Sequence, residues 1–366
     1  RAQVATAKMG AERYIEIVDK YGLETVEAAA EELMRSSEKL MRHAIAKLPD
    51  GVYHAEGLMD GFLDSSNPVE KDLKIAVTVT VQGDELTVDF TGTSPQMDHR
   101  PINMPFVGTV DIAVYHTLRS ILLDSAKYGH FPHNSGITRP INIVAPKGCL
   151  CNPIYPAPTI ARFMPGNVVA DTLMKALADI VPEQVSAGVG NLKALALSGK
   201  KGDDYWVYMD IMEGSYGGRF GKDGMDAVDT LYANTRNNPI EDIESHYPLR
   251  VTKYELRSYD CAPGRWRGGI GSIREITFLE NGSFSLEGDG NKYAPWGFAG
   301  GKDGKAGSIA IRYPDGTIQH LPSKIPNMAM EKGSTIIMEG PCGGGYGNPL
   351  EDRKSTRLNS SHTQKS

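Results

Sequence analysis

Apolar and polar or small residues alternate with a period of two over residues 73–81 and again over residues 86–90. The apolar set is Leu73, Ile75, Val77, Val79 and Val81, followed by Leu86, Val88 and Phe90. Between the two runs stands the turn sequence Gln82-Gly83-Asp84-Glu85. Because successive side chains of a strand point to opposite faces, the pattern predicts a β-hairpin with one buried face.

Helical periodicity dominates the beginning of the chain. Apolar residues recur at helical spacing over residues 4–18, with Gly22 as a stop, and again over residues 26–48, before the turn Pro49-Asp50-Gly51. The sequence therefore predicts a helical hairpin over residues 1–48. This pair is either an interface element or a pair packed on the protein's own sheet, and the spacing leaves both open.

The rest of the chain mixes helices with short strands. Helices are predicted over residues 109–123 and 167–181, and strands over 141–144, 249–256 and 272–279. No long linker and no fixed repeat divide the chain. We therefore expect an α+β fold in which the N-terminal helical hairpin packs with mixed, mainly antiparallel β-sheets joined by Gly-rich loops, with residues 49–350 as one body.

The two ends of the chain look unlike the body. The sequence begins with Arg1 rather than Met, so we expect it to start inside a longer protein. Residues 351–366 are polar with a single leucine, which predicts a disordered or foreign tail.

The charge balance and the cysteine content narrow the class of protein. A net charge of −6 makes binding to nucleic acid or to an anionic membrane surface unfavourable. No window approaches 18 consecutive apolar residues, so no membrane span is expected. Four cysteines without a secretory signal favour reduced thiols in the cytoplasm.

Common catalytic motifs are absent from the sequence. No Gly-Lys pair has a glycine five positions before it and Ser or Thr after it, so there is no Walker A loop, and no Gly-x-Ser-x-Gly elbow occurs. Cys149-x-Cys151 lacks zinc-site spacing. His130 and His133 flank Pro132 in a loop and are interpreted as surface residues rather than metal ligands.

A cluster of carboxylates is the first candidate site. Three acidic residues and a histidine stand together in Glu241-Asp242-Ile243-Glu244-Ser245-His246, framed by prolines. Neighbouring carboxylates hold divalent cations or share a proton with separated pKa values, as acid/base catalysis requires. The same residues also fit a solvated acidic loop.

Glycine clusters are the second candidate feature, in a chain with 40 glycines. Residues 213–224 combine glycines with Arg219 and Lys222, which suits either an anion-binding loop or a set of tight turns. Three more clusters follow at residues 264–271, 295–301 and 343–347. They predict either loops that meet around a site or a glycine-rich β scaffold, and spacing does not choose between them.

The order of the motifs resembles the hydantoinase B/oxoprolinase family over nearly all of residues 1–350. The matching segments are Arg1-Ala2-Gln3, Leu48-Pro49-Asp50-Gly51-Val52-Tyr53, Asp89-Phe90-Thr91-Gly92-Thr93-Ser94-Pro95-Gln96, Gly136-Ile137-Thr138-Arg139-Pro140-Ile141, Asn238-Pro239-Ile240-Glu241, Trp266-Arg267-Gly268-Gly269-Ile270-Gly271, Pro295-Trp296-Gly297 and Gly343-Gly344-Gly345-Tyr346-Gly347-Asn348-Pro349.

The resemblance implies a subunit of an ATP-dependent cyclic-amide hydrolase of the hydantoinase or 5-oxoprolinase type. An A-type partner would bind ATP and Mg and phosphorylate the amide, and the B-type chain would help water to open the ring. Family members carry a further N-terminal portion with a divalent metal, so the chain corresponds to the C-terminal two-thirds and is expected to be inactive alone. An acetone or acetophenone carboxylase subunit and a non-catalytic scaffold that docks the A-type partner are the alternatives.

The resemblance also selects polar residues that we expect to shape the cavity. Catalytic roles are expected for Glu241, Glu244 and Asp223. Substrate contacts are expected from Asn103, Arg139, Arg162 and Glu213, and no metal ligand is assigned within this chain. Asp89 and Arg267, in strand or turn contexts, are interpreted as structural.

Overall fold

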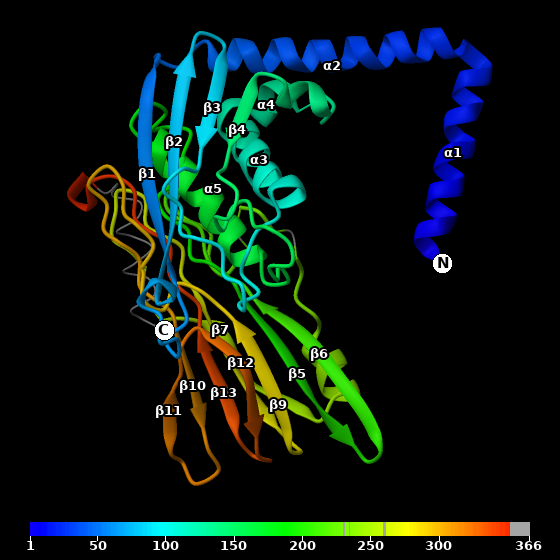
Figure 1. Cartoon of the computed structure of the whole chain (residues 1–366). Coiled ribbons are helices and arrows are strands. Elements are labelled where there is room, and N and C mark those ends of the chain that lie inside the picture. Colours follow the sequence, from blue (N-terminus) through cyan, green and yellow to red (C-terminus); the bar gives the residue numbers. More distant parts are fainter. Residues whose placement is uncertain (130, 230, 234, 259–260, 352–366) are drawn as a thin grey trace.

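The computed structural model describes residues 1–129, 131–229, 231–233, 235–258 and 261–351. Its body has an upper part, built from one sheet and its helices, and a lower part built from two further sheets (Figure 1). No helix among these residues has the length and apolar character needed to cross a membrane.

The upper part contains a four-stranded sheet in the order β1-β2-β3-β4, with β3 and β4 parallel and the other pairs antiparallel. Its apolar face packs against α3, α5 and the end of α2 in one core. The elements are α1 (Ala2–Tyr21), α2 (Leu23–Ile45), β1 (Gly51–Asp60), η1 (Pro68–Glu70), β2 (Asp72–Gln82), β3 (Glu85–Asp89), η2 (Phe106–Val110), α3 (Asp111–Leu122), α4 (Ser125–Tyr128), η3 (Ser135–Thr138), β4 (Ile141–Val144) and α5 (Phe163–Leu177).

The lower part contains two antiparallel sheets that enclose a second core. One has the order β11-β10-β13-β8-β7 and the other the order β12-β9-β5-β6. The elements are β5 (Lys193–Lys201), β6 (Asp204–Met212), α6 (Ile240–His246), β7 (Leu249–Leu256), β8 (Ser272–Phe278), β9 (Gly282–Glu287), β10 (Ser308–Arg312), β11 (Ile318–His320), β12 (Lys324–Met330), β13 (Thr335–Glu339) and η4 (Pro349–Glu351). The predicted α+β class with mainly antiparallel sheets is confirmed.

The predicted hairpin is β2 and β3, paired in the register Gln82 to Glu85 and Val81 to Leu86. Gly83 lies in the turn with a φ of 60°, which glycine adopts without strain. The alternating apolar residues of both strands are buried, so the periodicity identified the inner face correctly.

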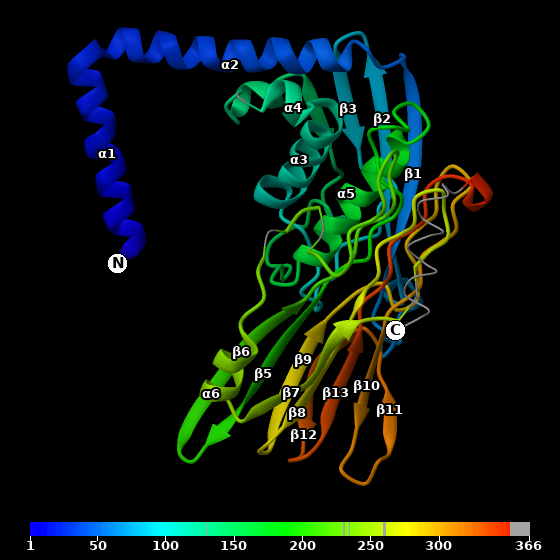
Figure 2. The same ribbon diagram turned by 180° about the vertical axis from the view of Figure 1, so that it is seen from behind.

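The two N-terminal helices form as predicted, but they do not fold back on each other as a hairpin. α1 leaves the far end of α2 and lies away from the body in both views (Figures 1 and 2). None of the residues of α1, all of which are described, is buried, whereas α2 buries Ser37, Met41, Ala44 and Ile45 near its C-terminal end. Of the two helices, only α2 therefore packs against the body, through its C-terminal end.

The four glycine clusters lie side by side in one layer of the structure. Backbone hydrogen bonds join them directly: Gly218 N donates to Gly344 O at 2.8 Å, Gly343 N to Gly269 O at 3.0 Å, and Phe298 N to Gly345 O at 3.0 Å. A Cβ atom at Gly344 would lie 1.9 Å from the carbonyl oxygen of Trp296. Glycine is required there because the backbones approach closely, which favours the scaffold interpretation for most of the layer.

Candidate functional site

Two polar pockets lie beside α5, where the upper part meets the glycine layer. The first, which we call the Asp171 pocket, is a cavity of about 190 Å³ between α5, β1 and residues 289–296. The second, the Asp223 pocket, has a volume of about 280 Å³ between α3, the end of α5 and the glycine cluster at 213–224. Enclosed spaces with a few convergent polar groups are the usual form of small-molecule sites.

Asp171 is a carboxyl group of the first pocket with a strongly raised pKa. Its Oδ2 accepts the indole N–H of Trp296 at 2.8 Å, and its Oδ1 accepts the backbone N–H of Val189 at 3.2 Å. Burial raises the pKa of Asp171 to about 6 in spite of these two hydrogen bonds. A carboxyl group with this pKa exchanges protons near neutral pH, which is typical of functional sites.

A buried hydrogen-bond network forms the floor of the same pocket. Asn191 Nδ2 donates to Asp289 Oδ2 at 3.1 Å, and the backbone N–H of Asp60 donates to Asp289 Oδ1 at 2.8 Å. Beneath them the buried Lys193 donates from Nζ to Asn291 Oδ1 at 2.8 Å. Burial raises the pKa of Asp289 and lowers that of Lys193 to about 8. The network fixes the lower wall of the pocket.

The Asp223 pocket combines cationic, acidic and imidazole side chains. It is lined by Arg219, Lys222 and Asp223 from the glycine cluster and by His116 from α3. Asp223 Oδ1 accepts the backbone N–H of Arg267 at 3.0 Å. Burial, and to a lesser degree the charge of His133, lower the pKa of His116. An imidazole and a carboxyl group that line one pocket are side chains of the kinds that transfer protons in enzymes.

Of the seven residues that the sequence singled out, Asp223 lies in one of these two pockets. Glu241 and Glu244 line neither of them. The segment predicted as an acidic loop is the helix α6, which lies beside β6 at the lower end of the body (Figure 2). Pro239 is its N-cap residue, and acidic residues in the first turn complement the helix dipole.

The remaining selected residues are held in local networks. The side-chain amide of the buried Asn103 hydrogen-bonds to the backbone of neighbouring loops. Its Nδ2 donates to Pro158 O and to Met97 O, each at 2.8 Å. Arg162 lies over the ring of Phe163, 4.6 Å from its centroid. These placements indicate structural contacts on the upper part rather than a common site.

Glu213 lies in a buried charge cluster at the end of β6. Its Oε2 is 3.4 Å from Arg274 Nη2 and accepts the hydroxyl of Tyr254 at 3.2 Å. Burial raises the pKa of Glu213, and the nearby guanidinium opposes that effect. Arg274 also pairs with Asp210. Because each charge has a partner, the cluster links β6 to β8.

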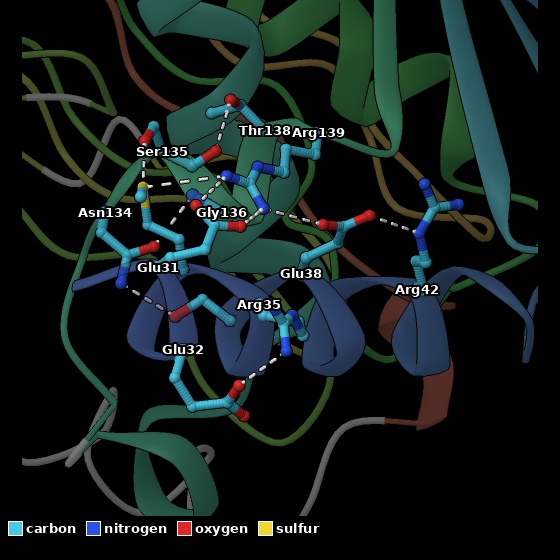
Figure 3. Close-up of polar contacts among 12 residues, drawn as sticks. Glu31, Glu32, Arg35, Glu38, Arg42, Asn134, Ser135, Gly136, Thr138 and Arg139 are labelled. Atoms are coloured by element: carbon cyan, nitrogen blue, oxygen red, sulfur yellow. Dashed lines mark hydrogen bonds and ion pairs between the residues drawn. The ribbon is translucent and has the colours of Figure 1, made fainter. Parts of the chain in front are cut away.

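Arg139 belongs to the contact between η3 and α2 (Figure 3). Its Nη1 donates to Glu31 at 2.9 Å and to Glu38 at 3.2 Å, and Glu38 also pairs with Arg42 at 2.9 Å. A Cβ at Gly136 would lie 1.9 Å from the carbonyl oxygen of Met34, so this glycine allows η3 to approach the helix. Arg139 therefore anchors α2.

Sequence reasoning missed His116, Asp171 and their surroundings. Asp171 belongs to a helix that the periodicity predicted, and Trp296 belongs to a family-like motif, but nothing local pairs residues 125 positions apart. Among the described residues, no three His, Cys, Asp or Glu side chains lie close enough to hold a metal ion. His130 lies outside the described residues.

The fold and the pockets define an α+β protein with two open pockets, lined by apolar and polar side chains as small-molecule sites commonly are. The chain belongs to the hydantoinase B/oxoprolinase family, whose model matches residues 1–349.

Two curated relatives illustrate the match. The B-type chain of the putative D-/L-hydantoinase of Pseudomonas sp. (strain NS671) is 71% identical over 351 residues, which are 96% of this chain and 59% of the relative. The beta chain of the caprolactamase of Pseudomonas jessenii is 27% identical, over 98% of this chain and 62% of the relative. The chain thus spans about three-fifths of the length of these relatives.

Two solved structures share the fold. The crystal structure of the ATP-dependent caprolactamase from Pseudomonas jessenii has a TM-score of 0.82 at 24% identity and covers 99% of this chain and 63% of that one. The nucleotide-free acetone carboxylase has a TM-score of 0.78 at 16% identity and covers 94% of this chain and 51% of that one. At these identities the likeness concerns the fold.

Proposed function

We propose that the chain is part of the B-type subunit of an ATP-dependent cyclic-amide hydrolase, and that it acts with an A-type partner that binds ATP and Mg. The observation that carries the proposal is the 71% identity, over 96% of this chain, to a protein named as the B-type chain of a hydantoinase. The name of the caprolactamase beta chain supports a cyclic amide as the substrate class.

The division of labour follows from the chemistry of amides. The carbonyl carbon of a cyclic amide is a poor electrophile, and phosphorylation of its oxygen by the partner opens this carbon to attack by water. The phosphate is released when the ring opens. This chain would hold the ring, exclude bulk water and move protons. Asp223 with His116 is our candidate pair for proton movement, because both line one pocket.

The other selected residues take supporting roles in this proposal. Glu244 accepts the backbone N–H of Val251 at 3.0 Å and pairs with Arg250 at 3.1 Å, which ties α6 to β7. Glu241 is exposed on the same helix. We propose a cytoplasmic location, in keeping with the reduced thiols that the sequence predicts for its four cysteines.

The test is reconstitution. The full-length protein and its A-type partner, mixed with ATP, Mg and a 5-substituted hydantoin, are expected to release the ring-opened N-carbamoyl amino acid together with ADP. Residues 1–350 with the same partner are expected to release none. Ring opening without ATP consumption would contradict the proposal. Incorporation of labelled bicarbonate into product would instead identify a carboxylase.

A further inference from the structure

The Asp171 pocket presents a hydrogen-bond acceptor and a donor one helical turn apart. Asp171 and Lys175 stand at positions i and i+4 of α5, and both line the cavity. Side chains with this spacing lie on one face of a helix, with Cβ atoms roughly 6 Å apart. No salt bridge joins the two among the described residues: Lys175 Nζ donates instead to the backbone oxygen of Glu56, at 3.3 Å.

Both groups retain capacity for a ligand. A carboxylate offers about four lone-pair sites, and the Asp171 oxygens accept one N–H each, from Trp296 and Val189. An ammonium carries three N–H donors, and one bond of Lys175 goes to Glu56. Lys175 is exposed at the rim, so its side chain can turn toward a bound molecule.

The amides that line the pocket are already engaged. Asn167 Nδ2 donates to Asn191 Oδ1 at 3.1 Å, and Asn167 Oδ1 accepts the backbone N–H of Tyr232 at 3.1 Å. Asn191 Nδ2 donates to Met164 O at 3.0 Å as well as to Asp289. These two side chains shape the wall, and the specific polar contacts fall to the carboxylates and Lys175.

A ring that contains an amide has the complementary edge. Ring closure holds the amide cis, so the N–H and the C=O leave the ring on the same side, whereas a linear secondary amide is trans and sends them in opposite directions. The indole of Trp296 and the side chains of Leu58 and Val168 supply an apolar wall for the rest of a small ring. A cavity of about 190 Å³ accommodates one such small ring.

We propose that the Asp171 pocket binds the ring of the cyclic amide before its oxygen is phosphorylated, with the ring N–H donating to Asp171, the carbonyl oxygen accepting from Lys175, and the ring packed against Trp296. This assignment rests on the function proposed above. It makes Asp171 and Lys175 substrate-binding residues that select a cis amide.

The experiment uses the full-length protein with its partner and compares single variants. Lys175→Gln is expected to raise the KM for a 5-substituted hydantoin about tenfold with a small change in kcat, because a charged hydrogen bond to substrate is lost. Lys175→Arg is expected to recover most of this loss. Lys147→Gln, an exposed lysine outside both pockets, is the matched control and should leave KM unchanged.

A substrate pair tests the contact with Asp171. The wild-type complex is expected to prefer the hydantoin about tenfold, in kcat/KM, over the same ring methylated at the nitrogen of the amide that is opened, because methylation removes the donor. Asp171→Asn is expected to lose that preference, and Asp179→Asn, an exposed residue beyond the end of α5, is expected to keep it.

The outcomes separate this assignment from the proposed function. If the complex opens no cyclic amide with ATP, the proposed function fails. If the complex turns over normally while Lys175→Gln keeps the wild-type KM and Asp171→Asn keeps the substrate preference, the assignment of the pocket is wrong. Because Lys175 is exposed, its variant remains informative even if Asp171→Asn does not fold.

Discussion

Arg139 and Glu31 are joined by two hydrogen bonds, 2.9 Å from Nη1 and 3.0 Å from Nη2, although 108 residues separate them in the sequence. The pair connects η3 to the middle of α2, whose N-terminal half extends beyond the body (Figures 1 and 3). A planar guanidinium facing a carboxylate through two bonds fixes direction as well as distance. The clamp therefore sets where the long helix leaves the fold.

The first prediction concerns this clamp. Arg139→Gln should increase cleavage within α2 by a limiting protease, while the thermal midpoint of the body changes little, because exposed ion pairs contribute little to global stability. Arg13→Gln, which removes an exposed pair with Glu16 inside α1, is the control and should leave cleavage of α2 unchanged. Equal cleavage of wild type and Arg139→Gln would contradict an anchoring role.

The strength of the contact between Arg139 and the glutamates of α2 depends on pH. Hydrogen bonds from Arg139 lower the pKa of Glu31, and those from Arg42 and Arg139 lower the pKa of Glu38, both from an ordinary value of 4.5. The stabilisation that accompanies a lowered carboxyl pKa is present above the ordinary value and is lost as pH falls through the folded-state pKa. Protease sensitivity of α2 should therefore rise below pH 4.5 in the wild type and change less in Arg139→Gln.

The second prediction concerns the glycine layer. Gly344→Ala would place a Cβ 1.9 Å from Trp296 O, and because both are backbone positions, neither can move cheaply. We expect a loss of stability of roughly 3 kcal/mol or more, measured by thermal or urea unfolding. Gly10→Ala meets no atom within 4 Å in α1 and should leave the midpoint unchanged or higher. A Gly344→Ala protein with the wild-type midpoint would show that the layer is looser than described.

The sequence predicted those helices and strands that local periodicity defines. Alternation identified β2, β3 and their buried face, because one face of a sheet must enter a core. It also located α2 and α5 to within a few residues. It did not show that the chain bends sharply at Gly22 rather than folding back, since an amphipathic pattern does not specify which surface covers it.

The candidate site was mostly beyond local reasoning. Asp223, which the family resemblance put forward as a catalytic residue, lines one of the two pockets, and its role stays a prediction. Asp171 was not put forward, because its properties depend on burial and on Trp296, which tertiary folding brings to α5. Clustered carboxylates pointed to Glu241 and Glu244, which lie on the short helix α6 and line neither pocket.

The third prediction follows for those glutamates. Glu241→Gln should leave kcat and KM of the reconstituted complex at wild-type values, since Glu241 is exposed on α6 and lines neither pocket. Glu244→Gln should keep KM but lower the thermal midpoint slightly, because it weakens the pair with Arg250. Asp223→Asn in the same assay should lower kcat at least tenfold. A large loss of kcat in Glu241→Gln would show that α6 contributes to catalysis, which would contradict this prediction.

The fourth prediction uses the titration of Asp171. Burial raises the pKa of this acid from 3.8 to about 6, so folding disfavours its charged form. The cost to folding stability is greatest above pH 6, falls as the pH is lowered, and vanishes below the pKa of the unfolded chain. The difference between the two pKa values corresponds to a cost of up to about 3 kcal/mol. In the Asp171→Asn variant, the side chain at position 171 carries no charge at any of these pH values. The wild type should therefore gain stability relative to this variant as pH is lowered from 8 to 5, seen as a growing difference in thermal midpoint.

The control for this titration is Asp179→Asn, which is exposed and outside the pocket. Its midpoint should differ from that of the wild type by an amount that stays flat over the same pH range, because an exposed carboxyl group has nearly the same surroundings in the folded and unfolded chain. If the thermal midpoint of the wild type instead falls relative to that of Asp171→Asn on acidification, the two hydrogen bonds from Trp296 and Val189 outweigh burial. The pKa of Asp171 would then lie below its ordinary value.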